Sequence, residues 1–265
     1  MKKYFTDIKI HIYFIFNLVP ICIIQGQNEN FFEKQVFIFH SVDTLNYRFM
    51  RPTNSDTTKK YPLVLFLHGS GERGNDNAKQ LKNGALNFAS SLNRTKFPCY
   101  VVVPQCAFGK QWVDVDWRLP SHIQPKKSSI YLERTIFLLD SLINKLNIDT
   151  NRIYITGLSM GGFGVWDAIS RWQWKFAAAV PVCGGGDTAK ASIVKDIPIW
   201  AFHGDIDKVV MVSRSRDMIA LIKKAGGSPK YTEYLNTGHN AWTETYSNTE
   251  MLEWLFFQSK MNRKK

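Results

Sequence analysis

The chain has little cysteine and no group of residues with the spacing of metal ligands. Four cysteines occur in 265 residues, and no glycine loop of the kind that cradles phosphates is present. We therefore expect neither a metal nor a cofactor. Apart from Cys22 near the start, the cysteines are Cys99, Cys106 and Cys183, an odd number that cannot complete a disulfide framework. Cys99 and Cys106 either pair with each other or stay free thiols, so the fold does not depend on cross-links.

The sequence also lacks a basic stripe, an internal repeat and a low-complexity tract. Lysine and arginine outnumber the acidic residues 34 to 22, which gives a net charge of +12, but these cations are spread along the chain. A nucleic-acid-binding protein would show a basic patch with interleaved aromatics or a known reader motif. We expect no nucleic-acid partner. With 45% hydrophobic residues the chain can build one sizeable core, and we predict a single domain over residues 27–265.

No apolar run is long enough to span a membrane comfortably. A basic start is followed by an apolar stretch over residues 12–24 and by Gly26, which is the layout of a secretory signal peptide over residues 1–26. The stretch is shorter than the ~20 residues of a spanning helix and is interrupted by Pro20. We predict cleavage after Gly26, a secreted or periplasmic protein, and no stable span; an uncleaved anchor is the alternative. Cys22 lacks the small residue before it that lipidation needs.

What the chain does contain is an alternation of short apolar runs with segments of helical spacing. We expect strands at residues 36–40, 45–49, 62–67, 100–103, 152–156, 176–182, 197–202 and 230–235, and helices at residues 78–92, 129–146, 160–172, 212–225 and 249–257. Strands that alternate with helices predict an α/β fold, a doubly wound, mostly parallel sheet with helices on both faces. In such folds ligands bind at the carboxyl ends of the strands.

The most informative motif is Gly157-Leu-Ser-Met-Gly161, which lies between a predicted strand and a predicted helix. A Gly-x-Ser-x-Gly sequence in this context is typical of a nucleophile elbow, a strained turn that lifts the serine hydroxyl above the sheet edge. The following helix directs its free N–H groups and the positive end of its dipole toward the same point. We predict that Ser159 is a nucleophile.

A serine nucleophile needs a base, and the base needs an acid. In this fold the chain order is serine, acid, histidine. Of six histidines, His239 alone follows both Ser159 and a later acidic loop, and it comes just after the last predicted strand. The acid falls in the segment that begins at His203, where Asp207 is favoured over Asp205 because the usual form is His-Gly-x-x-Asp-x-x-Val. His203 itself is interpreted as structural.

Attack on an ester carbonyl creates an oxyanion that preorganised donors must meet. The amide of Met160, directly after the nucleophile, is one predicted donor. The second is expected from the glycine-rich turn after the first long buried strand, at Ser70, with Gly71 as the alternative. His68 is interpreted as a buried residue that braces this turn.

A long irregular segment between residues 103 and 129 holds Trp112 and Trp117. Loops at this edge shape substrate pockets, and flat aromatic faces suit sugar rings or phenolic acyl groups. These two side chains either line the pocket or pack the loop onto the core. Trp242, three residues after His239, is expected to border the pocket.

Together these motifs resemble the serine esterases of the α/β-hydrolase superfamily, in particular the dienelactone-hydrolase-like, prolyl-oligopeptidase-type and feruloyl or polyhydroxybutyrate esterase branches. The resemblance covers about residues 47–257. Dienelactone hydrolases proper use cysteine where Ser159 stands, and prolyl oligopeptidases carry a propeller where fewer than forty mature residues precede the first buried strand.

The resemblance implies a secreted carboxylic-ester hydrolase that works through a covalent acyl-enzyme. More narrowly, it implies an enzyme that removes feruloyl or acetyl groups from plant polysaccharide, so the partner is a small-molecule or polysaccharide-linked ester. The alternatives are a peptidase or acyltransferase on the same triad, or a non-catalytic carbohydrate-binding protein. The oligomeric state stays open.

Overall fold

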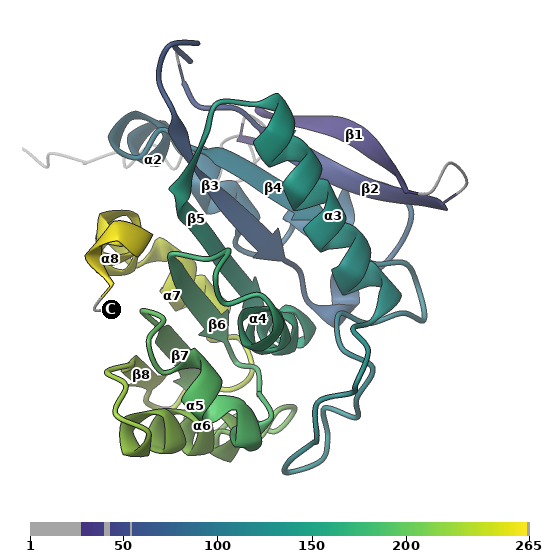
Figure 1. Ribbon diagram of the computed structural model, residues 1–265. Helices are drawn as coiled ribbons and strands as arrows, with labels where there is room; N and C mark the ends of the chain where they lie inside the picture. The colour runs from purple at the N-terminus through teal and green to yellow at the C-terminus, as the bar shows by residue number, and fades with distance from the viewer. Residues whose placement is uncertain (1–27, 40–42, 54, 264–265) are drawn as a thin grey trace, which may run out of the picture.

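The computed structural model describes residues 28–39, 43–53 and 55–263, and the predicted signal peptide lies outside them. The described strands form one sheet in the order β1-β2-β4-β3-β5-β6-β7-β8 (Figure 1). Their bounds are β1 Phe32–Phe39, β2 Asp43–Met50, β3 Tyr61–Leu67, β4 Tyr100–Pro104, β5 Ile148–Leu158, β6 Ala178–Val182, β7 Trp200–Gly204 and β8 Lys230–Tyr234. β1 and β2 are antiparallel at one edge, and β3 to β8 run parallel. The predicted mostly parallel α/β fold is confirmed.

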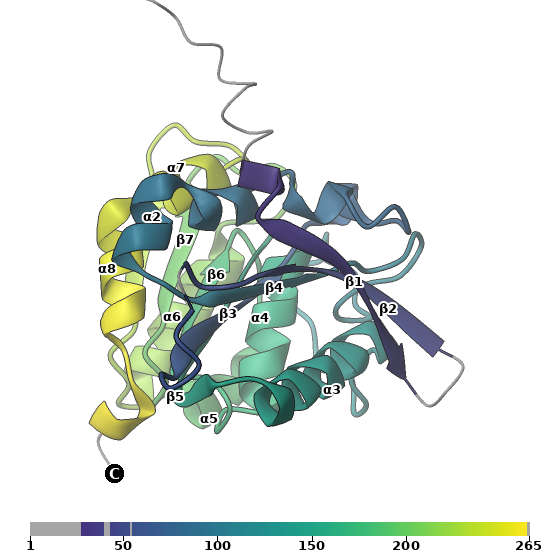
Figure 2. The ribbon, with the colours of Figure 1, turned by 90° about the horizontal axis from the view of Figure 1, so that it is seen from above.

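Helices cover both faces of this sheet, as Figure 2 shows. Their bounds are α2 Ser91–Lys96, α3 Ile130–Lys145, α4 Met160–Arg171, α5 Ala191–Val194, α6 Ser213–Lys224, α7 Trp242–Ser247 and α8 Thr249–Phe257, with short 3-10 turns η1 Ser70–Glu72, η2 Lys79–Leu81, η3 Ala85–Ala89, η4 Thr188–Lys190 and η5 Lys260–Asn262. Side chains of α3, α4 and α6 share one apolar cluster with the sheet, and those of η3, α7 and α8 share the other.

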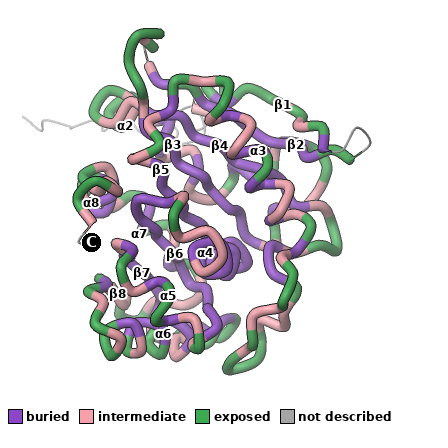
Figure 3. Tube along the Cα trace, viewed as in Figure 1, coloured by how far each residue is buried: buried purple, intermediate pink, exposed green. Residues whose placement is uncertain are grey.

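The central strands are apolar on both faces because both faces are covered. In β3 every residue from Leu63 to Leu67 is fully buried, and Figure 3 shows the buried trace running through the middle strands. α3 shows how local sequence and packing agree: the Ser129 hydroxyl caps its first turn by accepting from the Leu132 amide at 3.2 Å. Leu132, Ile136 and Leu139 then lie on its buried face.

The helix predicted over residues 78–92 is wrong. The segment forms η2, η3 and the start of α2, and the break falls at Gly84, whose φ is +85°. The ring of Tyr246, from α7, lies so close that a Cβ at position 84 would stand 2.2 Å from a ring carbon. Packing against a distant part of the chain therefore interrupts an otherwise helical pattern. The short helices α5 and α7 were not predicted.

Cys99, Cys106 and Cys183 are buried free thiols, which excludes the Cys99–Cys106 pair left open above. Burial raises the pKa of both Cys99 and Cys106 to about 12, so these two thiols stay protonated and unreactive at neutral pH. Among the described helices, none has both the length and the apolar character that crossing a bilayer would take.

Candidate active site

Ser159 stands at a sharp turn between β5 and α4, with φ 52° and ψ −119°. Backbone of this kind is strained for a residue with a side chain, and it persists only where the surroundings enforce it. Here the neighbouring backbone comes so close that only glycine fits two residues before and two residues after Ser159. A Cβ at Gly157 would lie 2.6 Å from the Leu67 carbonyl oxygen, and one at Gly161 would lie 1.9 Å from the same atom. The turn leaves Ser159 partly exposed to solvent.

His239 and Asp207 lie in line with Ser159. His239 Nε2 is 2.8 Å from Ser159 Oγ, and His239 Nδ1 is 2.7 Å from Asp207 Oδ2. The three side chains come from the ends of β5, β7 and β8, so they meet at the carboxyl edge of the sheet. The structure therefore brings together the serine, histidine and aspartate that were singled out from their order along the chain.

Asp207 is buried and fully bonded. Besides His239, its carboxylate accepts hydrogen bonds from the amides of Val209 and Val210 at 2.8 and 3.0 Å, and His203 Nε2 lies 3.2 Å from Oδ2. Burial by itself would raise the pKa of Asp207, but the bonds from His203, His239 and the Val210 amide outweigh it and hold the pKa well below that of an ordinary aspartate. Asp207 is thus a carboxylate that can orient His239 and stabilise its cation.

Asp205, the alternative acid, accepts a hydrogen bond from the histidine loop. Its Oδ1 accepts from the Thr237 amide at 3.1 Å, and the Ile206 amide donates to the Thr237 carbonyl at 3.2 Å. Gly204 permits this closeness, because a Cβ there would lie 2.2 Å from the carbonyl oxygens of Thr237 and Gly238. These contacts bind the aspartate loop to the histidine loop. They explain how Asp207, two residues further on, reaches His239.

The two predicted oxyanion donors each begin a helical turn. Met160 is the first residue of α4, and Ser70 is the first residue of η1. The first N–H groups of a helix have no partner inside it and are free for a ligand. Gly71, the second residue of η1, meets the same condition, so the choice between Ser70 and Gly71 stays open. Met160 is itself almost completely buried, and its amide opens the helix that follows Ser159.

His68 braces the turn that carries Ser70. Its Nδ1 lies 2.6 Å from the Gly69 carbonyl oxygen, and its Nε2 accepts from the Cys106 amide at 2.9 Å. Since a carbonyl can only accept, the ring proton is on Nδ1. Burial lowers the pKa of His68 to about 4, so the ring is neutral at neutral pH and joins the turn to the strand that ends at residue 104.

Glu72, at the end of η1, is a buried acidic side chain beside the predicted oxyanion turn. Its Oε1 accepts from Asn83 at 2.7 Å, while Oε2 is buried with no hydrogen-bond partner among the described residues. Burial raises the pKa of Glu72. A Cβ at Gly69 would lie 2.9 Å from Oε2, so this side chain packs closely against the turn.

The three predicted pocket tryptophans differ. The assignment of Trp112 to the substrate pocket is wrong: its side chain is fully buried, its Nε1 donates to the His68 carbonyl at 2.9 Å, and it packs on Gly164. Trp117 is half-buried and lines a hollow of about 580 Å³ together with Gln111 and other residues of the segment 114–118. Trp242 is half-buried and meets the His239 ring edge-on at 5.3 Å.

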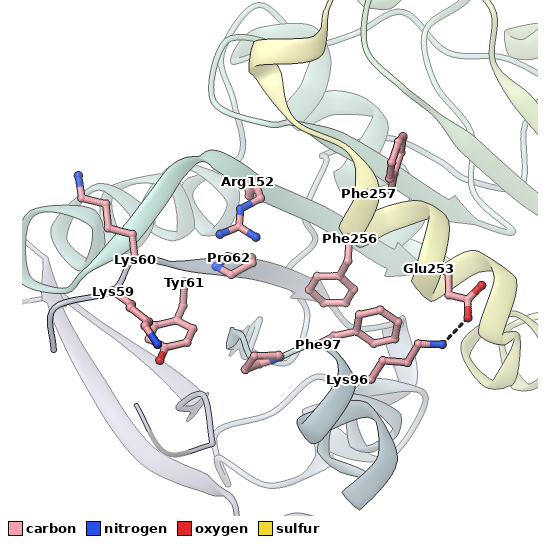
Figure 4. Close-up of a pocket in the computed structure, with 11 residues that line it drawn as sticks. Lys59, Lys60, Tyr61, Pro62, Lys96, Phe97, Arg152, Glu253, Phe256 and Phe257 are labelled. Carbon is pink, nitrogen blue, oxygen red and sulfur yellow. Dashed lines mark hydrogen bonds and ion pairs between the residues drawn. The ribbon is translucent and has the colours of Figure 1, made fainter. Parts of the chain in front are cut away.

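A groove of about 650 Å³ lies at the amino ends of the parallel strands, where β3 and β4 begin, and thus at the end of the sheet opposite to Ser159 (Figure 4). Phe97 and Phe256 stack in it with ring centroids 4.7 Å apart. Three of its four cations have carboxylate partners, as Lys59 pairs with Asp56, Lys96 with Glu253 and Arg152 with Asp149. Little unpaired charge remains to attract an anion. Among the described residues, no three histidine, cysteine or acidic side chains are arranged to hold a metal ion.

The parallel sheet, the strained serine turn and the bonded serine, histidine and aspartate define an α/β-hydrolase. The sequence profile of the Phospholipase/Carboxylesterase family matches residues 51–251, and the chain belongs to that family. The resemblance to α/β-hydrolase serine esterases is thus confirmed.

Known proteins agree with this assignment. A thermostable esterase of known structure is 40% identical, with a TM-score of 0.83 over 88% of this chain and 64% of its own. A bifunctional acetylxylan esterase/xylanase, XynS20E, from Neocallimastix patriciarum is 28% identical over 156 residues, which are 59% of this chain and 21% of that protein. The chain thus corresponds to about a fifth of this curated relative. Dipeptidyl peptidase 4 of Porphyromonas gingivalis, 17% identical with a TM-score of 0.63 over 86% of this chain and 35% of its own, shares the fold.

Proposed function

We propose that this protein is a serine carboxylesterase in which Ser159 is the nucleophile, His239 the general base and Asp207 the acid that orients it. The observation that carries the proposal is the continuous hydrogen-bonded line from Ser159 Oγ through His239 to Asp207, at 2.8 and 2.7 Å. At these distances the Ser159 hydroxyl proton can pass directly to His239 Nε2, while Asp207 accepts a hydrogen bond from Nδ1. The esterase relative at 40% identity supports the reaction class.

In the first half-reaction, Ser159 Oγ attacks the ester carbonyl carbon and its proton passes to His239 Nε2. The carbonyl oxygen becomes an oxyanion, which the amides of Met160 and Ser70 are proposed to bind. The C–O bond to the alcohol then breaks, and the departing oxygen takes the proton from Nε2. Asp207 stabilises the imidazolium that exists between these two transfers.

In the second half-reaction, water attacks the acyl-enzyme carbonyl and gives its proton to His239 Nε2. The bond between the acyl group and Ser159 Oγ breaks, and the serine recovers its proton from Nε2. The carboxylic acid leaves and the site is restored. No metal or cofactor is called for in either half.

For the substrate, we propose acetyl or feruloyl esters of plant polysaccharide, cleaved by a secreted enzyme. The acetylxylan esterase activity in the name of the Neocallimastix relative supports the acetyl ester in particular. Trp242 meets the His239 ring edge-on, and Trp117 lines the hollow of about 580 Å³; we propose that both side chains contact the substrate. A signal peptide over residues 1–26 would export the enzyme to such a substrate.

The test is hydrolysis of an activated phenyl ester, with acetylated xylan and a feruloylated oligosaccharide as natural substrates. Wild-type protein should show a burst of phenol and covalent labelling by an organophosphonate. Ser159→Ala should lose about 10⁶-fold in kcat and all labelling, whereas the exposed Ser192→Ala should keep both. Hydrolysis that survives in Ser159→Ala would refute the assignment of the nucleophile. Activity on phenyl esters without release of acetate or ferulate would refute the polysaccharide substrate alone.

A further inference from the structure

A second histidine contacts the carboxylate of Asp207. His203 lies in β7 and is completely buried. Its Nε2 is 3.2 Å from Asp207 Oδ2 and 3.0 Å from the Val210 carbonyl oxygen. Asp207 Oδ2 therefore stands between two imidazole rings, with His239 Nδ1 at 2.7 Å and His203 Nε2 at 3.2 Å.

The partners of His203 determine where its proton lies. An ionised carboxylate and a backbone carbonyl can only accept hydrogen bonds, so Nε2 carries the proton and donates to both. On the other side of the ring, Nδ1 is 2.8 Å from Ser215 Oγ, whose longer contact, 3.3 Å, is with the Gly184 carbonyl. With the ring proton on Nε2, Nδ1 is placed to accept a hydrogen bond from the Ser215 hydroxyl.

We propose that His203 is a positioning residue for the proposed esterase reaction and that it acts through Asp207. Its Nε2–H bond to Val210 ties the end of the aspartate loop to β7, so the carboxylate cannot turn away from His239. The same N–H group shares the negative charge of Asp207 and so limits how strongly that carboxylate holds the His239 cation. This inference rests on the proposed function, since it concerns the reaction of Ser159.

The other titratable groups around the pair do not replace His203. Burial, and to a lesser degree the negative charge of Asp207, raises the pKa of the Cys183 thiol, which keeps this side chain neutral. Glu233 is held by Arg216 at 2.6 Å, and Asp205 is engaged with the Thr237 amide. Among the described residues, the histidines are the titratable side chains that hydrogen-bond to Asp207.

The test compares two substitutions at position 203. His203→Phe keeps a buried ring but removes the donor, and we expect kcat to fall about 10- to 100-fold with little change in KM, because the acid is less firmly placed. His203→Gln retains an N–H donor at the position of Nε2 and should restore most of this loss. With its charge unshared, Asp207 should hold the His239 cation more strongly, so the acidic limb of the kcat/KM profile should move to higher pH in His203→Phe by about half a unit.

Thr135→Val is the matched control, because it removes a fully buried hydroxyl in α3, on another part of the fold. It should alter thermal stability while leaving the pH profile in place. A folded His203→Phe enzyme with wild-type kcat and an unmoved acidic limb would overturn the inference. So would a Gln variant no better than the Phe variant.

If His203→Phe does not fold, the wild-type protein decides by itself. Long-range ¹H–¹⁵N correlation spectra should show His203 with its proton on Nε2 and a bare Nδ1 at neutral pH, and a ring protonated on Nδ1 alone would overturn the inference. A wild-type protein that cleaves no ester would instead refute the proposed function, which the Ser159→Ala comparison detects before any His203 variant is made.

Discussion

The two edges of the parallel sheet carry polar groups in very different states. At the carboxyl edge, Asp207 is buried and its oxygens accept from two amides and two imidazoles. At the amino edge, the groove of Figure 4 holds charged side chains in solvent, with Lys59 71% exposed and its partner Asp56 40% exposed. Exposed ion pairs of this kind contribute at most about 1 kcal/mol each. This groove of about 650 Å³ is therefore not where the protein has its buried, fully hydrogen-bonded polar groups.

The difference follows from the topology. The carboxyl ends of parallel strands bring successive loops to one edge, together with the N-terminus of the following helix. Ser159, Asp207 and His239 each follow a different strand and converge there. The groove at the amino edge has aromatic walls but no such convergence, since Tyr61 merely begins β3 and Arg152 lies within the first half of β5. Chemistry is expected at the first edge and simple packing at the second.

Of the substitutions that test this difference between the two ends of the sheet, the one at Asp207 is expected to change kcat most. Asp207→Asn should lower kcat about 10³- to 10⁴-fold, because an amide presents a donor to His239 and favours the wrong tautomer. Asp205→Asn keeps the oxygen that accepts from Thr237 and should change kcat no more than about threefold. Steady-state kinetics on a phenyl ester with both variants measures the difference. Equal losses would mean that the two acids share the role.

A second, smaller effect concerns acid stability. His68 has a pKa of about 4 in the folded protein and about 6.5 in an unfolded chain, so between these values the unfolded state binds a proton that the folded state does not. The free energy of unfolding should thus fall as pH drops from 6.5 to 4, by up to about 3 kcal/mol for this one group. Urea unfolding at pH 7, 5.5 and 4.5 measures it.

The matched variant for this prediction is His68→Asn, which retains a donor for the Gly69 carbonyl but does not titrate. It should flatten the pH dependence between 6.5 and 4. Wild-type and variant slopes that coincide would show that His68 contributes nothing to it.

The smallest effect on activity is expected at the groove. Phe256→Ala removes the partner of Phe97 and should lower the free energy of unfolding by about 2–3 kcal/mol, while kcat per folded molecule stays within about twofold. Lys60→Ala, at the one groove cation without a carboxylate partner among the described residues, should change stability by less than about 0.5 kcal/mol. Thermal unfolding and esterase assays on the same samples separate the two quantities. A large loss of kcat in either variant would show that the two edges are coupled.

Much of this architecture was predictable because the signals are local. Alternating apolar runs and helical spacing indicate the doubly wound sheet without any knowledge of contacts. The Gly-x-Ser-x-Gly motif around Ser159 is also local, since its residues are consecutive in the chain, although the atom that requires its glycines is the Leu67 carbonyl oxygen at the end of β3. Where the prediction failed, a distant residue decided: Tyr246 breaks the helix expected over residues 78–92, and His68 and Gly164 draw Trp112 into the core.

The sequence by itself determined the class of fold, the Gly-x-Ser-x-Gly motif around Ser159 and the order of serine, aspartate and histidine, because each depends on residues that are near in the chain or on their succession. Only the tertiary structure decided that Asp207 reaches His239 while Asp205 joins the two loops, and that His203 also touches the acid. Those outcomes depend on contacts between strand ends far apart in sequence. Short-range patterns carry no information about contacts that form only when the sheet is assembled.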